Sequence, residues 1–151
     1  MKPEEIAALY KLNMLYGEKL PGIAMAWVES GMDSQALIEL AWEHSPTMRD
    51  AAPLLEKGLQ DICVDIPTRE RALVLLQNIY CKQILNGDVI PFEGANSIWQ
   101  KICTEDEAPN SSSEFGSLAE ALQNTRKPEF IEKLNSRIVS AAKKFVIEVN
   151  V

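Results

Sequence analysis

Apolar side chains recur every three or four positions along most of the chain, which is the period of a helix buried on one side. Residues 69–85 are the most regular, with Leu73, Leu76, Tyr80 and Ile84 at spacings of three, four and four. Proline, glycine and polar capping residues divide the pattern into eight predicted helices. They cover about residues 3–16, 21–30, 35–43, 51–63, 69–85, 91–103, 115–124 and 128–146.

Local signals predict where several of these helices begin and end. Gly17 is predicted to end the first helix, and Asp50 to cap the fourth, which would place Pro53 in its first turn. Asn86-Gly87 fits a left-handed end of the fifth helix, and Pro91 fits the first position of the sixth.

The pattern contains no convincing pair of strands. The tail VIEVNV alternates and could form a short extended end, but one strand alone makes no sheet. A chain of 151 residues can bury a sizeable core without disulfides or metals. We therefore predict an all-α fold, a compact single-domain bundle of seven or eight helices over residues 1–151. A polar loop at about 104–114 would separate the first six helices from the last two.

Two features of the apolar pattern bear on packing. The segment PGIAMAWVES, residues 21–30, is apolar almost all round, which predicts a central helix. Trp27, Trp42 and Trp99 all lie within apolar helical patterns, which favours core positions for the three side chains. For Trp42, near a helix end, an exposed position as an interface anchor is the alternative.

Charge is unevenly distributed along the chain. The formal net charge is −7, and residues 1–107 carry 9 basic and 17 acidic side chains against 6 and 5 in residues 108–151. An acidic surface repels phosphate and attracts basic partners, which disfavours nucleic-acid binding. The basic stripe of the last predicted helix lacks interleaved aromatic residues and is interpreted as a solvated face.

The cysteines and the length of the apolar runs bear on the cellular compartment of the protein. Cys63, Cys81 and Cys103 are odd in number, form no C-x-x-C pair and lie in apolar patterns, which favours buried free thiols in a reducing environment. The start MKPEEIAAL lacks a long apolar stretch, and no run approaches the roughly 20 residues that span a bilayer. We predict a cytoplasmic protein that does not enter a membrane.

The candidate reactive groups do not form a recognisable catalytic or metal motif. His44 is the only histidine and fits the end of a helix, and Glu39 with Glu43 fits a solvated acidic face, because no Glu-x-x-His motif accompanies them. In ILNGDVIPFEGANSIW, residues 84–99, a phosphate loop would need more glycines and a basic residue. We therefore predict no cofactor, no metal and no enzymatic activity.

Two stretches resemble a group of small all-helical bacterial proteins, mostly uncharacterised. The signature Gly-x-x-x-Pro-x-Glu-Gly-Ala-x-x-Ile-Trp is matched by Gly87, Pro91, Glu93, Gly94, Ala95, Ile98 and Trp99. WVESGMDSQALIELA, residues 27–41, is similar to a second pattern that reads Asp-Ser-Pro-Ser-Leu-x-x-Leu-Ala, with Gln35 where proline is usual. The resemblance covers about residues 20–103. Some helical proteins of this size are similar to immunity proteins of polymorphic or contact-dependent toxin systems.

Charge and resemblance together predict an immunity-type protein that binds and neutralises a basic bacterial toxin domain through an acidic surface. The alternative is a helical adaptor or regulatory subunit that binds its partner through an apolar groove. An enzyme with a carboxylate-lined site is a third hypothesis, and the oligomeric state stays open. The predicted partner-binding residues, at helix ends and loops of the acidic part, are Glu29, Asp33, Asp88, Glu93, Glu105, Asp106 and Glu107.

Overall fold

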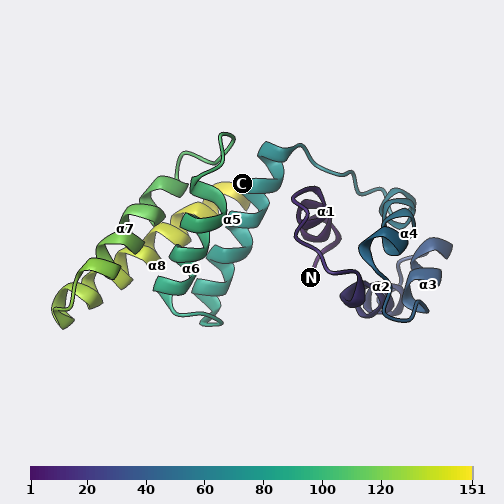
Figure 1. The fold of residues 1–151 in the computed structure, drawn as a ribbon, viewed down its shortest axis with the longest axis horizontal. Helices are drawn as coiled ribbons and strands as arrows, with labels where there is room; N and C mark the ends of the chain where they lie inside the picture. The colour runs from purple at the N-terminus through teal and green to yellow at the C-terminus, as the bar shows by residue number, and fades with distance from the viewer. Residues whose placement is uncertain (151) are drawn as a thin grey trace. The chain divides into compact units, whose positions relative to one another are not determined.

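A computed structural model describes residues 1–150, without the side chain of Asn150. Within these residues the chain is all-α and contains no strand, as predicted (Figure 1). It divides into two compact units, an N-terminal unit of Met1–Thr68 and a C-terminal unit that begins at Arg69. The division falls between the fourth and fifth helices, and the polar loop at 104–114 lies inside the C-terminal unit.

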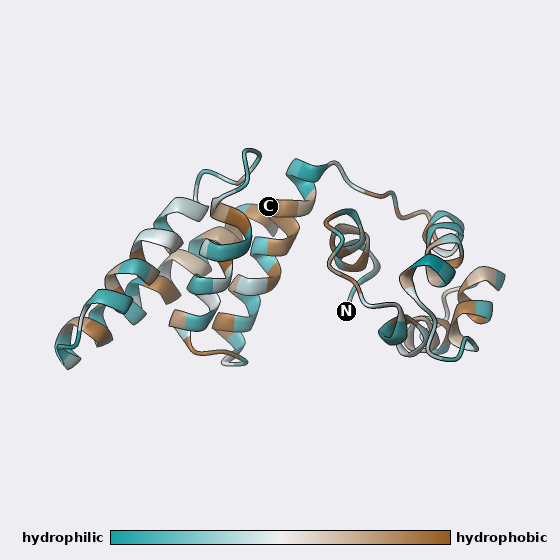
Figure 2. Cartoon of the chain, viewed as in Figure 1, coloured by the Kyte–Doolittle hydropathy of each residue, from teal (hydrophilic) through white to brown (hydrophobic). Residues whose placement is uncertain are grey.

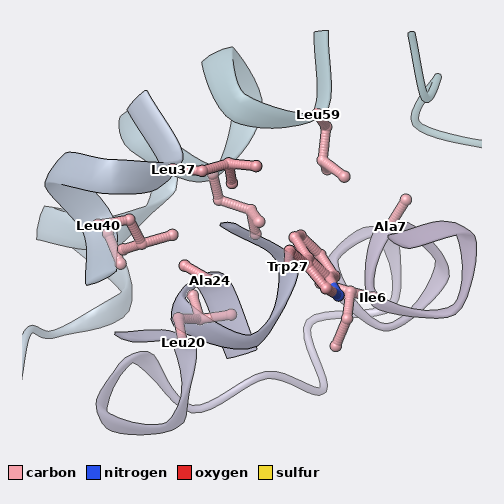
Figure 3. Close-up of a cluster of buried hydrophobic side chains, with 10 residues drawn as sticks. Ile6, Ala7, Leu20, Ala24, Trp27, Leu37, Leu40 and Leu59 are labelled. Atoms are coloured by element: carbon pink, nitrogen blue, oxygen red, sulfur yellow. The ribbon is translucent and has the colours of Figure 1, made fainter. Parts of the chain in front are cut away.

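The N-terminal unit is built from short helices around an apolar cluster. Helix α2 packs against α3, and α3 packs against α4. The cluster includes Ile6 from α1, Trp27 from α2, Leu37 from α3 and Leu59 from α4, whose side chains converge in Figure 3. The elements of this unit are α1 (Pro3–Lys11), a 3-10 turn (Gly17–Lys19), α2 (Leu20–Glu29), α3 (Gln35–Ala41) and α4 (Met48–Asp61).

The C-terminal unit uses longer helices. Helix α5 packs against α8 and α6, and α7 packs against α6 and α8. Hydrophobic and hydrophilic bands alternate along α5 in Figure 2, as the regular spacing in the sequence predicts. The elements are α5 (Arg69–Asn86), α6 (Pro91–Ile98), a π-helical segment (Trp99–Cys103), α7 (Ser112–Asn124) and α8 (Pro128–Asn150).

The joint between α5 and α6 has the geometry that its residues predict. Gly87 adopts a φ of 76°, and the Asp88 amide donates to the Gln83 carbonyl over 2.9 Å, which closes α5 in a left-handed cap. Ile90 is extended, with φ −68° and ψ 150°, as the residue before a proline should be. Each of these residues therefore serves a helix end.

Several predictions of helix ends are wrong, and α7 begins at Ser112, three residues before its predicted start, so residues 112–114 are helical and not part of the polar loop. Helix α1 ends at Lys11 and not near residue 16, because Asn13 turns the chain with a φ of 55°. Helix α4 begins at Met48, where Thr47 and Asp50 form a reciprocal capping box, so Pro53 lies inside the helix. The tail is not extended, since α8 continues to Asn150. Val151 lies outside the described residues.

Helix α2 is not central, although its sequence is the most apolar. Leu20, Ala24 and Trp27 are buried, whereas Gly22 and Ala26 are exposed and Ile23 is half-buried. Apolar content predicts that a helix would gain from burial, but only neighbouring elements can cover it. Within the N-terminal unit, one side of α2 has no such neighbour.

Candidate functional site

The seven predicted acidic residues fall into three places. Glu29 ends α2 and Asp33 lies in the turn before α3, so both belong to the N-terminal unit and are exposed. Asp88 and Glu93 flank the start of α6, whereas Glu105 and the two residues after it follow the π-helical segment. Residues 93 and 103 lie on one continuous helical segment, about 15 Å apart at 1.5 Å per residue. The C-terminal unit therefore does not gather its five predicted residues into one surface.

Glu105 already has an intramolecular partner. The Arg69 Nη2 atom donates to the Glu105 Oε2 atom over 2.7 Å and forms an ion pair with it. The hydrogen bond that Arg69 donates to Glu105, followed by the negative charge of Glu105, raises the pKa of Arg69 above its ordinary value. This pair connects the first residue of α5 to the loop after the π-helical segment. Glu105 is consequently less available to an external partner than Asp106 or Glu107.

The division into units concentrates the negative charge. Residues 1–68 contain 5 Lys/Arg and 11 Asp/Glu, a net charge of −6, whereas residues 69–151 contain 10 and 11, a net charge of −1. Of the net charge of −8 that residues 1–107 carry, −6 thus belongs to the N-terminal unit. Any electrostatic attraction of a basic partner acts mainly through that unit.

Trp42 is the most exposed of the large hydrophobic side chains, at 77%, so the prediction of a core position for it is wrong. The Ser34 side chain accepts a hydrogen bond from the Leu37 amide and fixes the start of α3, whose Leu37 and Leu40 are fully buried. At 100° per residue, position 42 lies about 160° away from position 40 around the helix axis. Burial of Leu40 therefore turns Trp42 to the outside.

The other two tryptophans agree better with the predicted core positions. Trp27 is 5% exposed, as predicted, and its Nε1 atom donates to the Met1 carbonyl over 3.0 Å. Trp99 is half-buried, and a Cβ atom built on Gly116 of α7 would stand 3.2 Å from its ring. The spacing of 42 to the buried positions of α3 was the signal that distinguished Trp42 from these two.

Acidic and polar side chains surround Trp42 on the exposed side of α3. Glu39 precedes it by one helical turn and Glu43 follows it directly, and both are exposed. Ile38, four positions earlier, is half-buried beside them. His44, also exposed, occupies the turn after the helix. We call Ile38, Glu39, Trp42 and Glu43 the α3 surface, and it combines an aromatic side chain with two carboxylates.

A hollow of about 390 Å³ lies between the end of α1 and the start of α4 and is lined in part by Tyr10, Leu15 and Arg49. The Tyr10 hydroxyl donates to the Glu56 Oε1 atom. This hydrogen bond, followed by burial, raises the pKa of Tyr10 to about 12. A phenol with a raised pKa keeps its proton at neutral pH, so the pair connects α1 to α4 and is a poor candidate for acid–base chemistry.

The cysteines differ in their surroundings, and one prediction about them is wrong. Cys81 is buried, which raises the pKa of its thiol to about 12. Cys103 is half-buried, and its Sγ atom donates to the Ser112 carbonyl over 2.9 Å. Cys63 is exposed and not buried, because it adopts a φ of 60° in the turn after α4.

Among the described side chains, no group of three or more His, Cys, Asp or Glu residues is placed to hold a metal ion. Within residues 1–150, no helix combines the length and hydropathy needed to cross a bilayer. Comparison of the chain with models of protein families, with curated proteins and with solved structures finds no match. The resemblance over residues 20–103 therefore stays a prediction.

Proposed function

We propose that this is a cytoplasmic immunity-type protein that binds and neutralises a basic toxin domain with the acidic N-terminal unit, through the α3 surface. The observation that carries the proposal is Trp42, 77% exposed between Glu39 and Glu43 on a unit of net charge −6. The resemblance to immunity proteins of polymorphic or contact-dependent toxin systems supports the same role. The protein acts by occupying its partner and performs no chemistry of its own.

The α3 surface has the composition of a small binding centre. Tryptophan is enriched among the residues that dominate binding energies, because its large ring loses much water-exposed area when a pocket covers it. Carboxylates around such an anchor attract a basic partner over a distance and hold it in register. A toxin that binds nucleic acid presents basic side chains to phosphate, so its substrate-binding surface is complementary to Glu39 and Glu43.

The predicted acidic residues take different parts in this proposal. Glu29 and Asp33 belong to the same unit as Trp42 and add to its field. Asp88, Glu93, Asp106 and Glu107 belong to the C-terminal unit and contribute as separate exposed charges, while Glu105 pairs with Arg69. The α3 surface therefore supplies the specific contact, and the remaining carboxylates supply attraction.

The test uses the full chain and the product of the neighbouring gene, expressed together and then measured for binding and for toxicity. We expect Trp42→Ala to weaken binding by about 30-fold or more, the size typical of a central tryptophan. Tyr16→Ala is the matched control, because Tyr16 is 70% exposed in the same unit but lies outside the α3 surface. Changing both Glu39 and Glu43 to glutamine should mainly slow association and reduce its dependence on salt.

Three results would contradict the proposal. The neighbouring product could lack toxicity, or cells could die equally with this protein present. Alternatively, Tyr16→Ala could weaken binding as much as Trp42→Ala does. Circular dichroism of each variant checks that the helices are intact, since an exposed substitution should change stability by less than about 0.5 kcal/mol.

An apolar groove favours the alternative, an adaptor or regulatory subunit. It lies along α8, has a volume of about 690 Å³ and is lined in part by Pro91, Ile131 and Val139. Such a groove could take the apolar face of a partner helix. At about 1 M salt the screening length falls to about 3 Å, so binding that survives this salt and is lost in Val139→Glu would identify the groove as the site.

A further inference from the structure

A third hollow lies against the uncovered side of α2. It has a volume of about 530 Å³ and is lined by Met1, Glu18, Lys19, Gly22, Ile23, Ala26 and Trp27. The hydrogen bond from the Trp27 Nε1 atom to the Met1 carbonyl holds the chain at Met1 across α2 as one wall. The Met1 side chain is 64% exposed. The groove is therefore mostly apolar, and its two charged residues, Glu18 and Lys19, lie together near the start of α2.

Gly22 has no role within the N-terminal unit that requires glycine. Of the seven glycines, four have a neighbouring atom within 3.2 Å of the place where a Cβ atom would stand, and two adopt a positive φ. Gly22 has neither feature, and a Cβ atom there would meet nothing within 4 Å. Glycine inside a helix is less favourable than alanine by about 1 kcal/mol. A backbone that approaches α2 from outside would explain a residue without a side chain at this position.

The charges along this side of α2 are self-complementary. Lys19, Gly22, Ala26 and Glu29 follow one another at spacings of three, four and three, lie on one face and are all exposed. Neither Lys19 nor Glu29 takes part in an ion pair within the described residues. The two cannot pair within one chain, because ten residues of helix separate them by about 15 Å.

The order of these residues is symmetric about position 24. Gly22 and Ala26 lie two positions to either side of it, and Lys19 and Glu29 lie five positions to either side. When two copies of a helix pack antiparallel across a twofold axis at such a centre, each residue faces its mirror position on the other copy. Lys19 of each chain then faces Glu29 of the other, and the small residues meet in the middle. A parallel pair would instead place the two Lys19 side chains together.

We propose that the protein forms a twofold homodimer in which α2 of one copy packs antiparallel in the groove along α2 of the other. The contact covers the apolar surface that the N-terminal unit leaves exposed, and it closes at two identical Lys19–Glu29 pairs. It is separate from the α3 surface, so the dimer and the toxin-binding proposal stand independently. The dimer does engage Glu29, which leaves Asp33 as the free carboxylate near that end of α2.

Sedimentation equilibrium of the full chain over a range of concentrations tests the dimer. We expect a mass twice that of the 16.9 kDa chain, falling toward one chain on dilution. Gly22→Leu should abolish the dimer, since a large side chain prevents close approach but meets open space in the monomer. Lys11→Glu, an exposed lysine outside this face, is the control for a change of charge.

The charge exchange tests the antiparallel arrangement. Lys19→Glu and Glu29→Lys alone should each weaken the dimer by about tenfold, because each change turns two attractive pairs into two repulsive ones. The double variant, Lys19→Glu with Glu29→Lys, should restore it, since every pair is again opposite in sign. A mass of one chain at all concentrations, a dimer unaffected by Gly22→Leu, or a double variant no tighter than the single ones would each overturn the proposal.

Discussion

The two units bury their apolar side chains with helices of different length and with different turns. The N-terminal unit uses α-helices of 7 to 14 residues, and Asn13, Ser45 and Cys63 join them in left-handed conformations that residues other than glycine seldom adopt. In the C-terminal unit α5 and α8 have 18 and 23 residues, and the one described residue with positive φ is Gly87. Short helices with sharp turns leave more of their sides uncovered, and both Trp42 and the exposed side of α2 lie in this unit.

The interiors differ as well. Leucine and alanine dominate the buried cluster of the N-terminal unit. In the C-terminal unit, Gln77 is fully buried on α5, and its Nε2 atom donates to the Ser111 hydroxyl over 2.9 Å. Long amphipathic helices can accommodate such a group because many other positions supply apolar contact. We therefore expect the stability of the N-terminal unit to depend more strongly on each apolar side chain, and on its sharp turns, than the stability of the C-terminal unit does.

The largest effect is expected in the apolar cluster of the N-terminal unit. Leu37→Ala should lower the free energy of unfolding by about 3 kcal/mol, because Leu37 is fully buried and fills the space against Gly58 of α4. Ile38→Ala is the matched control, since Ile38 is half-buried and should lose about 1 kcal/mol. Urea denaturation followed by circular dichroism measures both, and equal losses would show that the burial of Leu37 is not what counts.

Substitution of one closely packed glycine in each unit compares how well the two units tolerate an added Cβ atom. Gly17→Ala should lower the free energy of unfolding by about 3 kcal/mol, because the new Cβ atom would stand 2.4 Å from the Pro46 carbonyl oxygen, a backbone atom. Gly94→Ala should lower it by about 1 kcal/mol, because its obstacle is the Ile84 side chain at 2.3 Å and alanine favours the helix. Thermal unfolding of the two variants ranks them, and the reverse order would contradict the comparison.

The smallest effect concerns the Tyr10–Glu56 hydrogen bond. Because folding raises the pKa of Tyr10 from 10.0 to about 12, its contribution to stability is complete below pH 10 and is lost as the pH rises toward 12. Ultraviolet absorbance of the phenolate should show one tyrosine that ionises near 12 and disappears in Tyr10→Phe. In Glu56→Gln that ionisation should move back toward 10.0, and an unchanged titration would exclude Glu56 as its cause.

Much of the local structure follows from the residues alone. The all-α fold, the left-handed cap at Gly87, the start of α6 at Pro91 and the burial of Trp27 were predictable, because helical period and capping depend on neighbours a few positions away. The misplaced boundaries also have local causes. A capping box at Thr47 outweighed the proline at 53, and Asn13 ended α1 before Gly17.

The placement of whole helices was decided by tertiary structure. Periodicity shows which face of a helix is apolar, but not whether another element covers it, and so it did not reveal that one side of α2 is exposed. Nor could it show that Asp88 and Glu107 lie at different ends of α6 and the segment that follows it, or that the chain divides at Thr68. Burial and clustering depend on contacts between residues far apart in the sequence, and only the folded chain brings those residues together.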